Sequence, residues 1–224
     1  NLSKSNWHRT SLQSVIYQTV IALLLTVASI TSAFGQISVN QATSTNQVES
    51  LVEDVLLGSC VTVSNVNYIG PASAAGTFNA SGTTFTMQNG ILLTTGAANV
   101  AVGPDNDNDA GVDQGNSGDA DLTVLASETT YDAVVLEFDF VPQDDTLTFR
   151  YVFASEEYPE WVNSEYNDVF GFFMSGPGVS GPYTGGAANI ALIPGTTTPV
   201  AINNVNNGYS ANEPATGPCD NCAY

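Results

Sequence analysis

The sequence predicts a mainly β protein: a β-sandwich of the jelly-roll kind with one amino-terminal amphipathic helix and long acidic loops. Three observations favour this fold class. Short apolar runs carry most of the aromatic residues, Gly, Ser, Thr and Asn are abundant between these runs, and sustained helical periodicity occurs in one segment near the amino end.

The first 35 residues are typical of a secretory signal. Lys4 and Arg9 form a basic start, a mostly apolar run covers 15–30, and small residues close the segment. An uncleaved membrane anchor is the alternative reading of the apolar run. We expect cleavage of residues 1–35, a single secreted domain over residues 36–224, and no membrane insertion of that domain.

The charge of the remaining chain limits its function. Without the leader, the chain contains 22 Asp and Glu residues and one basic residue, Arg150. It contains no His, because His8 lies in the leader. Such a charge repels nucleic acid and anionic membranes, and favours divalent cations, basic partners or neutral glycans; solubility alone is the alternative. A Ser or Cys nucleophile would lack its usual base, so the sequence does not predict an enzyme.

The amino-terminal half contains the predicted helix. Residues 36–43 suit a first strand or tail. A helix follows over 45–57, where Val48, Leu51, Val52, Val55 and Leu56 share one face, with Ser44 or Thr45 as its cap and Gly58 at its end. Strands are predicted over Val61–Ile69, Thr84–Met87 and Gly90–Thr95, and residues 96–118 form a long polar loop.

A hairpin is the clearest signal in the next segment. Asp119 can cap a short helix through Leu125. Apolar and polar residues then alternate in Ala133–Val141 and in Thr146–Ala154, with a turn over 142–145. This hairpin would set Glu137 opposite Arg150 across the two strands.

Apolar residues occupy both faces of Val169–Met174, which predicts a buried central strand. Shorter strands are predicted over Ile190–Ile193 and Val200–Ile202. No strand closure or anchor follows them, so we expect a domain truncated at its carboxy end. Cysteines number three, Cys60, Cys219 and Cys222, and export favours a structural disulfide whose pairing stays open.

The first acidic cluster predicts a calcium site. Asp105, Asp107 and Asp109 alternate with Asn, and Asp113, Asp119 and Asp121 follow, which gives six carboxylates within 17 residues. Hard oxygen ligands on a loop suit Ca²⁺. The cluster is not an EF-hand, because Ala110 and Asn116 occupy the sixth and twelfth positions counted from Asp105. A solvated acidic loop is the alternative.

The second acidic cluster lies between two apolar runs and contains Glu156, Glu157, Asn167 and Asp168. A second Ca²⁺ site is the favoured interpretation. A glycosidase pair drawn from Glu156, Glu157 and Asp168 is an alternative, since such enzymes need two acids across a cleft, and a plain surface is another. The candidate metal ligands are therefore Asp105, Asp107, Asp109, Asp119, Asp121, Glu156, Glu157, Asn167 and Asp168.

Several motifs occur in the order of a known family. The main ones are YDAVVLEFDF (131–140), FRYVFASEEYPE (149–160) and NDVFGFF (167–173), with LLG (56–58), VTVSN (61–65), GILLTTG (90–96), GDADL (118–122) and IALIPG (190–195). In these motifs the chain resembles the choice-of-anchor L domain of secreted and surface proteins of Bacteroidetes-type bacteria. The resemblance implies an extracellular β-rich module, no established catalytic residue, and further modules or a sorting segment beyond the Cys-x-x-Cys region.

Together these features predict a non-catalytic extracellular module of a bacterial surface protein. We expect it to serve adhesion or surface assembly, with Ca²⁺-stabilised loops and an extracellular glycan or surface protein as partner. Attachment to the cell would use a region outside this chain. The alternatives are a secreted carbohydrate hydrolase and a ligand-free structural spacer.

Overall fold

The computed structural model describes residues 35–57, 61–104, 110–143, 145–156 and 161–205. The chain divides into two compact units, Asn1–Gly35 and Gln36–Tyr224. This boundary lies at the end of the predicted leader, and the helices and strands described below belong to the second unit.

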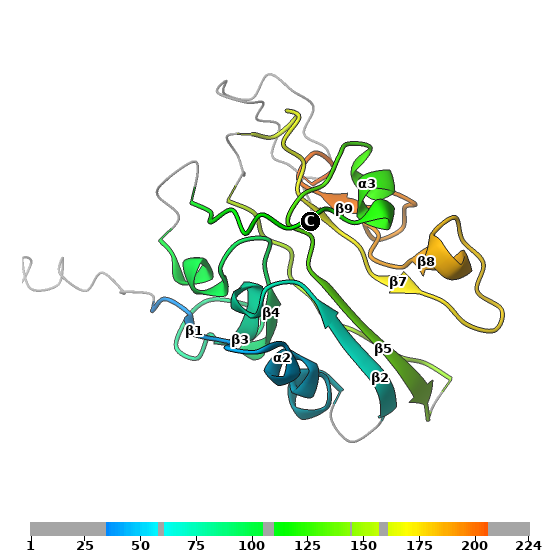
Figure 1. Ribbon diagram of the computed structural model, residues 1–224, viewed down its shortest axis with the longest axis horizontal. Coiled ribbons are helices and arrows are strands. Elements are labelled where there is room, and N and C mark those ends of the chain that lie inside the picture. Colours follow the sequence, from blue (N-terminus) through cyan, green and yellow to red (C-terminus); the bar gives the residue numbers. More distant parts are fainter. Residues whose placement is uncertain (1–34, 58–60, 105–109, 144, 157–160, 206–224) are drawn as a thin grey trace, which may run out of the picture. The chain divides into compact units, whose positions relative to one another are not determined.

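The second unit contains short helices and nine strands among the described residues (Figure 1). In chain order the elements are β1 (Ser38–Gln41), α2 (Thr45–Leu51), the π-helix η1 (Val52–Leu57), β2 (Val61–Ile69), η3 (Ala72–Ala74), β3 (Ala75–Asn79), β4 (Asn89–Leu93), η4 (Ala98–Val102), α3 (Ala120–Ala126), β5 (Val135–Pro142), β6 (Val169–Phe170), β7 (Phe173–Met174), η5 (Thr184–Gly186), β8 (Ala188–Asn189) and β9 (Val200–Ala201). The short helices η3, η4 and η5 are 3₁₀-helices.

The strands form small antiparallel sheets. One sheet has the order β1-β3-β4, and the pairs β2-β5, β6-β9 and β7-β8 form the others. The antiparallel strands and the amino-terminal helix of the predicted fold are present. The described part of the chain is nevertheless a mixed structure with two α-helices, and its sheets make no clear sandwich.

The amino-terminal helix begins where the sequence predicts. The Ser44 side chain accepts a hydrogen bond from the backbone N–H of Gln47 and so caps α2. From Val52 the helix continues as the π-helix η1, whose wider turns change the phase of the apolar stripe. Val48 and Val52 are therefore fully buried, whereas Val55 is 37% exposed.

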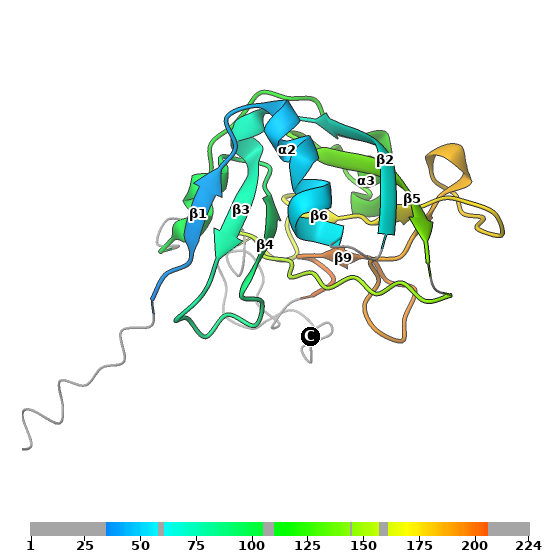
Figure 2. The ribbon, with the colours of Figure 1, turned by 90° about the horizontal axis from the view of Figure 1, so that it is seen from below.

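A small hydrophobic core joins α2 to three strands. Buried Val48 packs with Ala42, Tyr68 of β2 and Ala75 of β3, and the partly buried Val134 and Leu136 lie against this group. Figure 2 shows α2 between the three-stranded sheet and the β2–β5 pair. The helix thus connects the two larger β-structures of the chain.

The strand β5 has a different partner from the one expected. β2 pairs with β5 from Val61 opposite Pro142 to Ile69 opposite Val135, so the predicted hairpin with Thr146–Ala154 is wrong. β2 provides Tyr68, which lies in the α2 core beside Leu136 of β5, whereas the aromatic rings of Thr146–Ala154 pack elsewhere.

The aromatic contacts of this segment show where it packs. The ring of Phe149 lies 4.7 Å from that of Phe172, and the ring of Tyr151 lies 4.9 Å from that of Phe170. Glu137 consequently accepts a hydrogen bond from Asn67, not from Arg150 as predicted. Arg150 is exposed and forms no salt bridge within the described part of the chain.

The three-stranded sheet includes a strand that hydrophobic periodicity did not reveal. β3 consists largely of small residues, and a Cβ at Gly76 would lie 2.4 Å from the backbone oxygen of Asn40 in β1. Only glycine permits this approach of the two backbones. The predicted strand Thr84–Met87 is wrong, because this segment bends and the Thr83 hydroxyl accepts from the N–H of Phe85.

The predicted central strand Val169–Met174 is divided into β6 and β7, and its side chains are half-buried. The break lies at Gly171 and Phe172, where the N–H of Phe172 donates to the side chain of Asn189. β9 confirms the strand expected near Val200, while Ile190–Ile193 is not a strand and follows β8 instead.

Candidate functional site

Asp119 caps the short helix that the sequence predicts. Its Oδ1 accepts hydrogen bonds from the backbone N–H groups of Asp121 and Leu122, both at 2.9 Å. The backbone around the cap is fixed by Thr130, whose hydroxyl accepts from the Asp119 N–H and donates to the Asp119 carbonyl. One carboxylate oxygen of this candidate metal ligand is thus occupied by the helix terminus.

Asp121 joins α3 to a distant turn. Its Oδ1 accepts from the backbone N–H of Thr184 at 3.1 Å and from the Thr184 hydroxyl at 3.2 Å, and its Oδ2 lies 3.1 Å from the same N–H. Thr184 begins η5. The carboxylate therefore holds together two segments that are 63 residues apart in the chain.

Asn167 and Asp168 belong to a connected polar network. Asn167 donates to the Ala126 carbonyl at the end of α3 and accepts from the N–H of Asn203. Asp168 accepts from the Ser155 hydroxyl at 2.5 Å through its side chain and from the N–H of Ile202 through its backbone. These two candidates fix the start of β6 against α3 and β9.

Glu156 lies beside the first acidic cluster. A Cβ built at Gly111 would lie 3.3 Å from the Oε1 of Glu156, so this part of the first acidic cluster lies next to the second. Sequence patterns do not predict this proximity, because 45 residues separate Gly111 from Glu156. The two predicted clusters are neighbours at this point.

The remaining candidates Asp105, Asp107, Asp109 and Glu157 lie outside the described residues, as do Cys60, Cys219 and Cys222. Within the described ranges, no three His, Cys, Asp or Glu side chains form a group that could hold a metal ion. Of the candidates that the structure describes, Asp119, Asp121, Asn167 and Asp168 accept hydrogen bonds from the protein, and Glu156 lies next to Gly111.

Asp132 is a structural carboxylate that was not among the predicted site residues. Its two oxygens accept from the backbone N–H groups of Gln114 and Asn116, at 3.0 Å and 2.6 Å. Its own backbone has a positive φ of 48°, which Asp tolerates better than most residues. The available signal was an Asp directly before the apolar run of β5.

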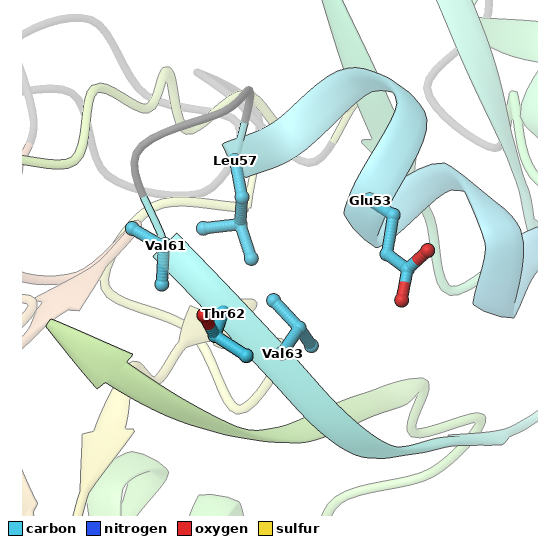
Figure 3. Close-up of a pocket in the computed structure, with 5 residues that line it drawn as sticks. All are labelled: Glu53, Leu57, Val61, Thr62 and Val63. Carbon is cyan, nitrogen blue, oxygen red and sulfur yellow. The ribbon is translucent and has the colours of Figure 1, made fainter.

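One hollow among the described residues lies away from these carboxylates. A pocket of about 300 Å³ is lined by Glu53, Leu57, Val61, Thr62 and Val63. In Figure 3 the side chains of Leu57, Val61 and Val63 lie between η1 and β2, and the Glu53 carboxylate stands on the other side of the opening. With a single carboxylate, this pocket offers neither a metal site nor a pair of acids for hydrolysis.

A second hollow of about 180 Å³ lies where the β2–β5 pair ends. Ile69 and Val135 form part of its lining, and residues 116–119 form another part. The Nδ2 atom of Asn116 is buried and has no hydrogen-bond partner among the described residues.

Small antiparallel sheets, exposed acidic side chains and carboxylates that hold loops together define a β-rich module built around acidic connections. The family of this module follows from its sequence. Residues 38–224 match the model of the choice-of-anchor L domain, and the chain belongs to that family. No curated protein and no solved structure matches the chain.

Family membership implies an anchored surface module or a secreted one. The resemblance inferred from the motifs is thereby confirmed. Among the described residues, no helix combines the length and the apolar character that crossing a membrane requires.

Proposed function

We propose that this chain is a non-catalytic adhesion or surface-assembly module whose acidic loops are ordered by Ca²⁺. The proximity of Gly111 to Glu156 carries the proposal, because it brings the first acidic cluster next to the second. Like charges that are brought together repel unless a cation or solvent screens them. Ca²⁺ is the cation that such oxygen-rich loops suit best.

Hydrogen bonds assign four of the candidate ligands to a structural role. Asp119, Asp121, Asn167 and Asp168 accept from protein donors, and we assign them to the frame around the site. The sequence pattern of the two acidic clusters leads us to propose Asp105, Asp107, Asp109, Glu156 and Glu157 as the residues that contact the ion. This assignment extends the sequence-based prediction, which did not separate frame from ligands.

Thermal unfolding in excess EDTA, in millimolar Ca²⁺ and in Mg²⁺ at equal ionic strength tests the proposal. A ligand that binds only the folded state stabilises it by about 2.7 kcal/mol at a hundred times its dissociation constant. We expect a higher Tm in Ca²⁺ alone and a loss of this difference in Glu156→Gln. Glu128→Gln, at an exposed glutamate outside both clusters, is the matched control. Equal melting in all three solutions would favour the ligand-free spacer.

The absence of catalysis is part of the proposal. The Ser155 hydroxyl already donates to Asp168, and the predicted mature chain has no His or Lys to serve as a base. The competing hydrolase would use Glu156 with Asp168. Cleavage of neutral oligosaccharides that disappears in both Glu156→Gln and Asp168→Asn would establish the hydrolase instead.

The module is proposed to act at the cell surface, with an extracellular glycan or surface protein as partner. The family supports this location. We also propose a jelly-roll-like sandwich, supported by the antiparallel pairing of the described strands. Hydrogen exchange tests it: slow exchange of the amides of β6 and β9, equal to that of β5, would support a fuller second sheet.

A further inference from the structure

The β2–β5 pair has one face in the core and one face in solvent. Val63 and Tyr68 point inward with Phe140 and Leu136, their partners in the register. The outward side chains are Thr62, Ser64, Asn65, Asn67, Ile69, Glu137, Asp139 and Val141, and each of them is exposed. The face is therefore polar along its middle and apolar near its ends.

A β-bulge shapes the middle of this face. The register shifts between Ser64 and Asn67, so that two residues of β2 stand opposite Phe138 alone. Asn65 has a positive φ of 54°, and this conformation turns its side chain to the outward face next to Ser64. Bulges that re-aim a side chain often occur at functional sites, and backbone outliers are a reason to look for function.

Two amide–carboxylate pairs result from this geometry. The Nδ2 of Asn65 donates to the Oδ2 of Asp139 at 2.6 Å, and the Nδ2 of Asn67 donates to the Oε2 of Glu137 at 3.3 Å. Each pair keeps a second amide N–H as donor, and amide and carboxylate oxygens as acceptors. Donors and acceptors thus alternate across a rigid strand pair.

This alternation determines the chemistry of the ligand. A hydroxyl group donates and accepts, so it can satisfy both members of a pair, whereas Lys and Arg only donate and would leave the amide N–H groups unpaired. Anionic ligands would meet two carboxylates with no cation on this face. An uncharged polyhydroxyl chain is the complementary partner.

The hollow at the end of the pair adds a second feature. It begins at the exposed Ile69 and at Val135, the last pair of the ladder, and continues to Asn116. The Nδ2 of Asn116 has no acceptor among the described residues. A ligand oxygen in this hollow would provide one once the amide turns toward it, and Ile69 would offer an apolar wall.

We propose that the outward face of β2–β5, with the hollow at its Ile69 end, binds a neutral glycan. The proposal rests on the adhesion function proposed above and gives that function a surface and a ligand class. It does not depend on Ca²⁺ at the acidic loops, so the two ideas can fail separately.

Isothermal titration calorimetry tests the proposal on the purified protein with four neutral probes, cellohexaose, laminarihexaose, mannohexaose and chitohexaose, and with octa-arginine as a basic comparison. The test variant is Asn65→Gly with Asn67→Thr, because glycine accepts the positive φ at the bulge and threonine suits a strand. Asn89→Thr is the matched control, an exposed asparagine at the start of β4. Unchanged unfolding temperatures would show that both proteins remain folded.

We expect at least one hexaose to bind, with an affinity that the double variant lowers roughly tenfold and the control leaves unchanged. Because the ligand is uncharged, added salt should change this affinity little. Absence of binding by all four hexaoses at millimolar concentration would overturn the proposal, as would equal binding by the double variant. Binding of octa-arginine alone, lost at high salt, would assign the face to a basic partner and also overturn it. If glycan binding fails in one of these ways while Ca²⁺ still raises the Tm, the glycan site is wrong but the proposed calcium-ordered module still stands.

Discussion

Asp121 and Thr184 are joined by hydrogen bonds although 63 residues separate them: the aspartate carboxylate accepts from both the backbone N–H and the hydroxyl of the threonine. The bond ties α3 to η5. We expect Asp121→Ala to lower the free energy of unfolding by about 1 kcal/mol, and Thr184→Val to lower it by less, since the N–H donor remains. Urea unfolding measures both. Glu128→Ala should change little, and equal stability of Asp121→Ala and the parent protein would contradict this role of the bond.

Variants of the cap residue Asp119 can distinguish a structural role of its side chain from a metal-binding role. Asp119→Ala should destabilise the protein by about 1 kcal/mol, because two N–H groups lose their acceptor, whereas Asp119→Asn keeps an acceptor and should cost less. Thermal unfolding in EDTA gives this comparison. Repeated with Ca²⁺, it tests the assignment of Asp119 to the frame. A full loss of calcium stabilisation in Asp119→Asn would make Asp119 a ligand after all.

Gly118 lies where two segments nearly touch. A Cβ at this position would lie 1.9 Å from the backbone oxygen of Thr130. Gly118→Ala therefore requires a backbone shift, and we expect a loss of stability of about 3 kcal/mol or more, or failure to fold. Gly82→Ala is the comparison, because its Cβ would meet nothing within 4 Å although its φ is +83°. That variant should lose only about 1 kcal/mol through backbone strain. Equal losses in chemical denaturation would mean that the approach of Gly118 to Thr130 is not as close as described.

The buried Tyr68 predicts an alkaline loss of stability. Desolvation by burial raises the pKa of Tyr68 from 10.0 to about 12, and its hydroxyl donates to the Pro71 carbonyl at 2.7 Å. The folded state therefore favours the neutral phenol. This contribution is complete below pH 10 and is lost as the pH rises from 10 toward 12, where the unfolded chain releases the proton first.

Unfolding free energies between pH 8 and pH 11.5 measure this effect. In Tyr68→Phe the Tyr68 part of the alkaline loss should disappear, while stability at neutral pH falls by about 1 kcal/mol with the hydrogen bond. Tyr131→Phe is the control, because Tyr131 is 74% exposed. An alkaline slope that is the same in the parent protein and in Tyr68→Phe would exclude Tyr68 as its source.

The sequence predicted correctly the helix starts and strands that are determined by interactions between neighbouring residues. Ser44 and Asp119 identified two helix starts, and β2 was predicted with the bounds that it has, because capping and short-range alternation depend on neighbouring residues. Thr146–Ala154 alternates just as clearly, yet β5 pairs with β2. β2 is the partner of β5 because of its packing in the α2 core and the hydrogen bonds that Asn65 and Asn67 donate to β5. Hydrophobic periodicity carries no information on these long-range contacts.

The candidate site was predictable in composition but not in arrangement. Asp119, Asp121 and Asp168 were predicted as site residues because they lie in acidic clusters of the sequence. Their hydrogen bonds to α3, Thr184 and Ser155 depend on which segments the fold brings together. The contact of Gly111 with Glu156 has the same origin. β3 was not predicted for a different reason. Its mostly small residues show no alternation of apolar and polar side chains, and they allow close packing against β1.

The pairing of β2 with β5 also has a consequence for how fast the chain can fold. Asn67 and Glu137 are 70 residues apart, so their ladder must close a long loop before its contacts can form. Non-local pairings of this kind place β proteins among the slower folders, in the range of roughly milliseconds to seconds. We expect stopped-flow refolding to be slowed by a longer chain between the two strands, and a rate indifferent to that length would mean that β2 and β5 meet after the rate-limiting step. Until they meet, the apolar sides of both strands stay in water, and the unfolded chain passes through a period in which other chains can compete for its strand edges.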